Sequence, residues 1–214
     1  MLDLHCDDDS LKHIFTSPEL MPGLQDLADW MGVAATLTAE DSGGGSFDEV
    51  LPSLYRKARL ANPGHPIPAG AETATLEYRG AADSFDALGQ ADAAGLFGFF
   101  AARGLIAADP GPRPQPVPGP TPFEATEVLR VDAPGLLAYR VELGDRVTSG
   151  QPIADLIAMD GPEAFIARRP ILAGTDGFVL SRVSGKYVRR GASVAKIVGT
   201  EVLPTRAGGY LLED

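Results

Sequence analysis

Apolar and polar positions follow two different spacings in the first half of the chain. Residues 2–5 and 73–78 alternate between apolar and polar side chains, as in a β-strand with one buried face. Residues 33–37 also predict a strand. Between these segments, apolar residues recur at three- and four-residue intervals, which predicts helices. Strands that alternate with helices indicate an α/β layer over residues 1–108.

The predicted helices begin at capping residues, which are Ser17, Ser46 and Ser84. The second of these belongs to an S-x-x-E capping box that ends at Glu49. Glycine is expected to end the first helix at Gly32. The apolar positions that define the second helix are Val50, Leu54 and Ala58.

Proline then interrupts the pattern at every second position from Pro110 to Pro122. Proline fixes φ and lacks a backbone donor, so this segment is excluded from helices and from central strands. We therefore expect residues 109–122 to form an extended, semi-rigid linker.

Residues 123–214 are rich in Val, Ile, Leu and Gly and contain an internal repeat. The segment 144–150, GDRVTSG, is echoed by the segment 185–191, GKYVRRG, and apolar positions follow both at the same offset. Short strands separated by glycine turns, in two similar halves, predict a small all-β barrel or sandwich with internal pseudo-symmetry.

The composition narrows the classes of protein that remain. The formal net charge is −11, which argues against binding to nucleic acid or to anionic membranes, because both favour an excess of Lys and Arg. No apolar run approaches the length of a membrane span. The single cysteine, Cys6, excludes an intrachain disulfide and fits the reducing cytoplasm, where we expect the protein.

The first candidate for chemistry is His5, at the end of the first predicted strand. Strand ends of α/β sheets present ligands to clefts, and a neutral imidazole binds zinc. Asp3 shares its strand face and could hold the other ring nitrogen. The alternative is a partly buried histidine with a structural hydrogen bond. Cys6 points to the opposite face and is expected to be a core thiol.

The second candidate is Glu77, on a strand that otherwise consists of Thr, Leu and Tyr. Burial raises the pKa of a carboxylate, which suits a general base that activates water. The alternative is a solvent-exposed strand face, where a glutamate beside threonines is unremarkable. Spacing alone favours this alternative.

Four motifs in the same order resemble the succinylglutamate desuccinylase/aspartoacylase family. They are LDLHCD at residues 2–7, GGSFD at 44–48, TLEYRG at 75–80 and the terminal glycine-rich repeat. The resemblance implies part of a zinc-carboxypeptidase-like α/β/α catalytic domain, followed by a small all-β barrel-sandwich domain. It also implies hydrolysis of the amide or ester bond of small N-acyl amino acid-like substrates. His5 then matches a Zn²⁺ ligand, and Glu77 matches the glutamate that acts on the zinc-bound water.

The sequence departs from the family pattern at the metal site. The family's other two zinc ligands form a His-x-x-Glu motif upstream of the histidine strand, and its substrate-binding arginine motif also lies upstream. None of the three histidines here, His5, His13 and His65, is followed three residues later by glutamate. We therefore expect a fragment, a truncated gene product or one half of a split enzyme. It should be inactive alone, with a separate N-terminal fragment or a homo-oligomer as its partner.

Two other readings belong to different classes. The terminal repeat resembles biotinyl and lipoyl carrier domains, but the turn that would carry the modified lysine contains Met159, Asp160 and Gly161. A swinging-arm role is therefore not expected. The other alternative is a non-catalytic β-barrel binding module with a vestigial α/β partner. Zinc bound through His5 would separate the hydrolase from that module.

Overall fold

The computed structural model describes residues 1–43 and 45–206, and the chain forms two compact units. Unit 1 contains residues 1–7 and 12–123, and unit 2 contains residues 8–11 and the described residues from 124 onward. The boundary between residues 123 and 124 lies one residue beyond the end of the proline-rich segment, residues 109–122. Gly44 of the GGSFD motif and residues 207–214 of the predicted β-domain lie outside the described residues.

Unit 1 is built on one mixed β-sheet. Its order is β1 (Leu2–Asp7), β5 (Ala74–Gly80), β3 (His13–Thr16), β4 (Ala35–Thr38) and β6 (Thr121–Pro122). β3 runs antiparallel to β5, and the other neighbouring pairs are parallel. Three of these strands were predicted. β3 has no polar–apolar alternation because three of its four residues are buried, which includes both faces of the strand.

The three predicted helices are present. They are α1 (Met21–Met31), preceded by a 3-10 turn at Pro18–Leu20, α2 (Phe47–Ala61) and α3 (Asp86–Ala102). Gly32 ends α1 with a φ of 58°, which is left-handed. At the start of α2 the capping box differs from expectation. The Ser46 side chain makes no capping bond, and the Glu49 carboxylate instead accepts a hydrogen bond from the Ser42 amide at 2.9 Å.

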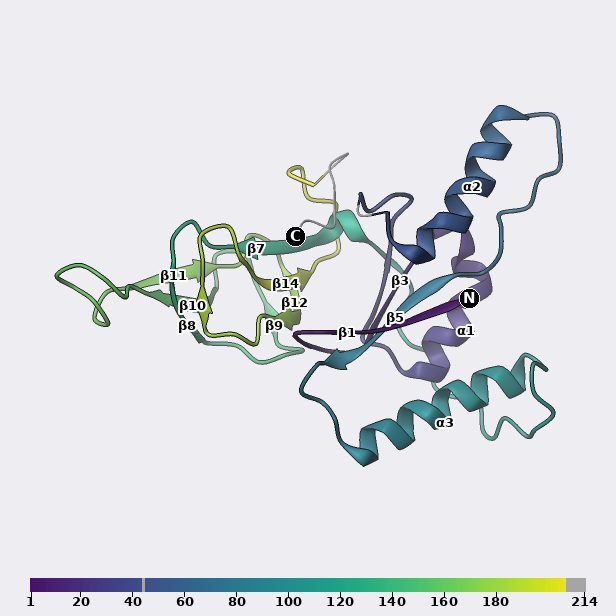
Figure 1. Cartoon of the computed structure of the whole chain (residues 1–214), viewed down its shortest axis with the longest axis horizontal. Coiled ribbons are helices and arrows are strands. Elements are labelled where there is room, and N and C mark those ends of the chain that lie inside the picture. The colour runs from purple at the N-terminus through teal and green to yellow at the C-terminus, as the bar shows by residue number, and fades with distance from the viewer. Residues whose placement is uncertain (44, 207–214) are drawn as a thin grey trace. The chain divides into compact units, whose positions relative to one another are not determined.

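Helices lie on both sides of this sheet (Figure 1). α1 packs on α3, and the core between them and the sheet contains Ile14, Ala74 and Leu76 of the strands. α2 lies on the other side of β1 and β5 from α3 (Figure 1). Two apolar residues that defined α2 in the sequence, Val50 and Leu54, are exposed rather than buried.

The proline-rich segment belongs to unit 1. The amide of Val117 donates a hydrogen bond to Oδ1 of Asp29 in α1 at 3.0 Å, and Val117 packs against the unit 1 core. The segment then ends in β6, at the edge of the sheet. It therefore runs back along unit 1 instead of serving only as a spacer, and proline is tolerated in β6 because that strand is an edge strand.

Unit 2 contains two antiparallel sheets whose strands follow the repeat. The first half supplies β8 (Gly135–Tyr139), β9 (Arg146–Val147) and β10 (Pro152–Ile157), and the second supplies β12 (Gly177–Arg182), β13 (Tyr187–Val188) and β14 (Ser193–Val198). β7 (Thr126–Arg130) and β11 (Arg168–Leu172) complete the sheets. The short strand of each half pairs with the first strand of the other, β9 with β12 and β13 with β8. The two halves therefore share one core.

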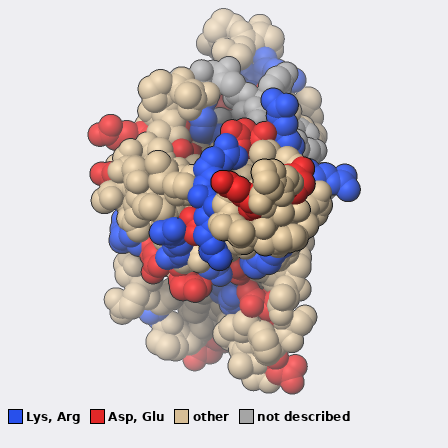
Figure 2. Space-filling view, turned by 90° about the vertical axis from the view of Figure 1, so that its left-hand side faces the viewer, with Lys and Arg blue, Asp and Glu red and all other residues tan. Residues whose placement is uncertain are grey.

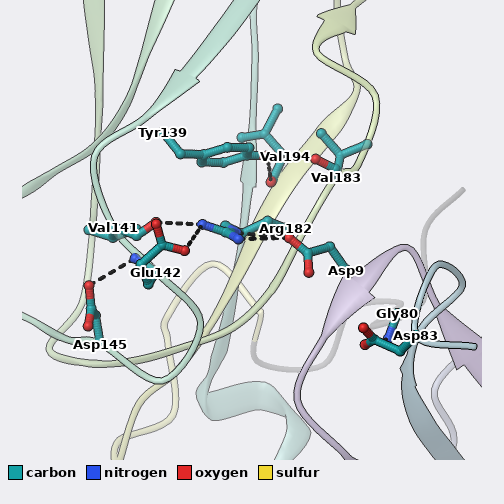
Figure 3. Close-up of polar contacts among 10 residues, drawn as sticks. All are labelled: Asp9, Gly80, Asp83, Tyr139, Val141, Glu142, Asp145, Arg182, Val183 and Val194. Carbon is teal, nitrogen blue, oxygen red and sulfur yellow. Dashed lines mark hydrogen bonds and ion pairs between the residues drawn. The ribbon is translucent and has the colours of Figure 1, made fainter. Parts of the chain in front are cut away.

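A short segment from the N-terminal part of the chain belongs to unit 2. β2 (Asp9–Ser10) pairs with β12, and the Arg182 guanidinium donates to Asp9 Oδ2 at 2.9 Å (Figure 3). The same guanidinium donates to the Val141 carbonyl at 2.7 Å and lies over the Tyr139 ring. This ion pair and the strand pairing assign residues 8–11 to the second unit.

Charges of both signs are mixed on the face in Figure 2. Arg140 contacts Asp155, and Arg169 forms a two-pronged pair with Asp132. Some of the basic side chains on this unit are therefore paired with carboxylates. In the described part of the chain, no helix combines the length and the apolar character that a membrane crossing requires.

Candidate functional site

His5 and Glu77 are direct neighbours across two strands of unit 1. They are Cα partners in the parallel pair of β1 and β5, and Glu77 is also the partner of His13 on β3. Partners across a sheet project to the same face, so the three side chains form one row. Asp3 and Thr75 are partners two residues earlier, on the same face.

A cavity of about 200 Å³ lies over this face. His5 is at its rim, with a side chain that is 51% exposed, whereas Glu77 is half-buried. Apolar residues of β3 and β4 and of the segments that follow β4 and β6 complete the wall, together with polar residues of α2 and of the loop before it. The lining residues are His5, Phe15, Thr16, Leu37, Ala39, Ser42, Ser46, Asp48, Glu49, Thr75, Glu77 and Phe123.

Asp3 contacts His5, as its position on the strand predicted. Its Oδ2 lies 3.1 Å from Nε2 of the imidazole. A carboxylate at this distance fixes the orientation of the ring and favours a proton on Nε2. The lone pair of Nδ1 is then available to bind a metal ion or another electrophile. The contact makes His5 a preoriented group at the mouth of the cavity.

Asp48 is a second cavity carboxyl, and sequence reasoning gave it no role. It follows the exposed Phe47 in the first turn of α2, yet only 4% of it is exposed. Burial raises the pKa of Asp48, hydrogen bonds with Thr75 and Ser46 oppose this effect, and the negative charge of Asp3 adds to it. The only signal in the sequence was its place in the GGSFD motif.

We expect Asp48→Asn to stabilise the protein, and to do so increasingly as the pH rises. The folded state binds the Asp48 proton more tightly than the unfolded state, so stability falls as pH rises through the raised pKa. The amide has no charge to desolvate. Urea unfolding of both proteins across the acidic range measures the difference. A difference that shrinks as the pH rises would contradict the assignment.

The strand that carries Glu77 is irregular immediately after it. The register with β1 shifts between His5 and Asp7, and Arg79 has a φ of 155°. The Arg79 guanidinium forms two hydrogen bonds with Asp92 of α3, at 2.7 and 2.8 Å. Lys12 contacts the same carboxylate at 2.6 Å. These contacts hold the bulge in place.

The charges around this bulge favour ionised Asp92. Burial raises its pKa, but hydrogen bonds from Arg79 and Lys12 outweigh that effect, and the pKa lies below its usual value. The irregular register also affects the position of Cys6, which lies between the shifted residues His5 and Asp7. We expected a core thiol, but Cys6 is exposed and lines a separate cavity with Tyr78 and Arg79. Among the described strands β1 lies at the edge of its sheet, and its face opposite His5 is not covered at Cys6.

The zinc site expected from the motifs is not complete in these residues. Within residues 1–43 and 45–206, no three His, Cys, Asp or Glu side chains are grouped so that they could hold a metal ion. A catalytic zinc normally has three protein ligands. His5, preoriented by Asp3, fits one of them, and the described residues do not by themselves fit the whole site.

The fold of this chain can be compared with those of solved structures. The chain has the fold of succinylglutamate desuccinylase/aspartoacylase proteins. The motifs indicated a resemblance to this family, and the shared fold confirms it. No protein-family model matches the chain, and the comparison with curated proteins found no match. The likeness therefore rests on structure.

Three solved structures illustrate it. A succinylglutamate desuccinylase/aspartoacylase-type protein from Shewanella frigidimarina NCIMB 400 matches 92% of this chain with a TM-score of 0.76 and 21% identity. A protein of the same family from Shewanella amazonensis SB2B matches 92% with a TM-score of 0.74 and 21% identity. The product-bound ectoine utilization protein EutE (DoeB) from Ruegeria pomeroyi matches 94% with a TM-score of 0.69 and 16% identity. These matches cover 52%, 53% and 57% of those chains, so this chain spans about half their length.

Proposed function

We propose that this chain is part of a hydrolase of the succinylglutamate desuccinylase/aspartoacylase type. Its substrates would be small N-acyl amino acid-like molecules, cleaved at the amide or ester bond. The observation that supports this most is the row formed by His5 and Glu77 on one face of the sheet, over a cavity. The fold shared with proteins of that type supports it independently.

Glu77 acts as the general base in this proposal. Its carboxylate takes a proton from the attacking water and passes it to the leaving amine, which is the chemistry that a half-buried carboxylate beside a cavity can perform. Asp3 orients His5. The apolar wall of Phe15, Leu37 and Phe123 excludes bulk water from the reacting bond.

We further propose Zn²⁺ as the cofactor, with His5 as one of its protein ligands. Zinc, when bound, polarises the acyl carbonyl and acidifies water. The remaining ligands would come from residues other than those described here. Because one histidine does not hold a catalytic zinc ion, we expect the 214-residue chain to be inactive alone.

The test is a hydrolysis assay with a panel of N-acetyl, N-succinyl and N-formyl amino acids. We expect no turnover by the 214-residue chain alone. We expect turnover of at least one substrate by a form of the protein that also contains the remaining zinc ligands. A chelator should abolish that turnover, and added Zn²⁺ should restore it. Zinc-dependent turnover by the chain alone would show that its own residues complete the site. No turnover by a zinc-loaded form would refute the reaction class.

A further inference from the structure

The cavity over the row of His5 and Glu77 is lined by acidic side chains. Asp48 and Glu49 of α2 line it together with Glu77, and among the described residues its lining contains no lysine or arginine. Asp48 is 4% exposed and Glu49 is 8% exposed. Water screens buried carboxyl groups only weakly, so the charge of a group that enters this cavity strongly affects its affinity.

Two of these carboxyl groups have neutral partners. The Asp48 carboxyl forms side-chain hydrogen bonds with Thr75 and Ser46. Oε1 of Glu49 accepts a hydrogen bond from the Ser42 amide at 2.9 Å. Neutral donors stabilise a carboxylate through these hydrogen bonds, but unlike a guanidinium or an ammonium group they do not cancel its charge. A cation is therefore the group that best complements this wall of the cavity.

The surroundings of Asp48 show the same preference. Burial raises the pKa of Asp48, and the negative charge of Asp3 adds to this effect. A carboxylate that entered the cavity would be buried beside like charges, which is unfavourable. A cation would instead favour the ionised form of Asp48 and offset the cost of burying it. The cavity therefore discriminates between anions and cations.

A buried hydroxyl group also faces the cavity. Ser42 lines it and is 4% exposed, and among the described residues Oγ of Ser42 has no hydrogen-bond partner. A buried polar atom without a partner destabilises a protein, and most such atoms in native structures are hydrogen-bonded. A ligand with N–H groups would supply a donor to this oxygen.

The rest of the wall limits the size of the ligand. Phe15, Leu37 and Phe123 give the cavity an apolar side, and its volume is about 200 Å³. Pockets that hold drug-sized ligands are larger, at roughly 300–1,000 Å³. The cavity therefore suits one short group, with an apolar chain against the two phenylalanines and a polar end at Asp48 and Ser42.

We propose that this cavity binds a primary ammonium group at the end of a short apolar chain, and that it disfavours carboxylates. The ammonium group donates hydrogen bonds to the Asp48 carboxylate and to Oγ of Ser42, and the chain packs against the apolar side. As a statement about substrates the inference rests on the proposed function, because it names the part of a substrate that lies beside the reacting bond. It then predicts a cationic substituent at this position of the substrate.

The test is an NMR titration of the full 214-residue chain with n-butylammonium, 1-butanol and n-butyrate, at one ionic strength and near neutral pH. We expect n-butylammonium to shift the amide signals of Ser42 and Glu49. Its affinity should be about tenfold or more above that of n-butyrate, because like charges repel in a poorly screened site. 1-Butanol should bind with an intermediate affinity. The readout is binding to the chain alone, so it requires neither zinc nor hydrolysis.

Two aspartate variants form a matched pair. Asp48→Asn keeps the shape of the side chain and removes its charge, so it should remove most of the preference for n-butylammonium over n-butyrate. Asp86→Asn makes the same change in the first turn of α3, at an exposed position outside the cavity, and should leave the preference unchanged. The formal net charge of the protein is −11. Both variants change it equally, so a general attraction of cations to the protein would be weakened equally in both.

Ser42→Ala tests the hydroxyl group separately. The variant keeps the backbone amide that donates to Glu49, so the loop before α2 should keep its conformation. The affinity for n-butylammonium should fall about threefold or more, because one hydrogen bond to the ligand is lost. Circular dichroism of each variant checks that the protein is folded.

Four results would overturn the proposal. Equal or tighter binding of n-butyrate would contradict a cation site, and tighter binding of 1-butanol would assign the cavity to a neutral group. Equal effects of Asp48→Asn and Asp86→Asn would show that the attraction is not local. Unchanged affinity of Ser42→Ala would remove the hydroxyl group from the site. These outcomes are distinct from a failure of the proposed hydrolysis, which is measured by turnover and which would leave the binding of the probes unchanged.

Discussion

Glu77→Gln should reduce the rate of amide hydrolysis by about 10²- to 10⁴-fold in any form of the protein that hydrolyses a substrate. Glutamine keeps the shape of the side chain and can still form hydrogen bonds, but it cannot accept the proton from water. Bound zinc should be unchanged, because the proposal gives Glu77 no role as a ligand. Steady-state kinetics and metal analysis of the same preparation measure both quantities.

Glu49→Gln is the matched control for this experiment. Glu49 lines the same cavity, but its carboxylate accepts a hydrogen bond from the Ser42 amide, and glutamine also offers an acceptor oxygen. We expect little change in rate. Hydrolysis that survives Glu77→Gln intact would remove Glu77 from the reaction. A parallel loss of zinc would make it a ligand rather than a base.

Gly177→Ala should destabilise the protein by about 3 kcal/mol. Gly177 begins β12, and a Cβ atom there would lie 2.3 Å from the carbonyl oxygen of Val198 on the paired strand. Because the obstacle is backbone, the two strands must separate to accept a methyl group. Urea unfolding followed by circular dichroism measures the loss.

The repeat supplies the control and a second test of the same cause. Gly185 lies in the second half of the repeat, and a Cβ atom there meets nothing within 4 Å, so Gly185→Ala should be close to neutral. Gly135 begins β8, and a Cβ atom there would lie 2.7 Å from the carbonyl oxygen of Ile157, so Gly135→Ala should resemble Gly177→Ala. Equal stability of Gly177→Ala and Gly185→Ala would contradict this account of the strand contact.

Some of this architecture could be predicted from local pattern alone. Strict alternation marked the strands that carry His5 and Glu77. Serines indicated roughly where the three helices begin, but the predicted capping was wrong, because the N-caps of α1 and α3 are Leu20 and Phe85 and Ser46 makes no side-chain capping bond. The constant offset between the two halves of the repeat appears in the structure as matching strands, β10 and β14. These features are local because side-chain direction repeats every two residues in a strand and every 3.6 in a helix.

Other features could not be read from periodicity. The short strand β3 is buried without alternation, so His13 had no assigned place until it was found in the row with Glu77. The apolar stripe of α2 indicated a helix correctly, but periodicity does not say whether the face it defines meets the core of the same chain. Cys6 was expected in a core, and only the edge position of β1 shows why it is exposed.

The sequence by itself singled out His5 and Glu77 as candidates, through their places on strands and through the motifs around them that resemble one family. Only the tertiary structure decided that His5 and Glu77 are partners, that Asp48 enters the same cavity and that residues 8–11 join the second unit. The physical reason is that strand register and burial depend on pairing between residues far apart in the chain. His5 and Glu77 are separated in the chain by three strands, a 3-10 turn and two α-helices. No pattern within either strand specifies which residue of the other it will face.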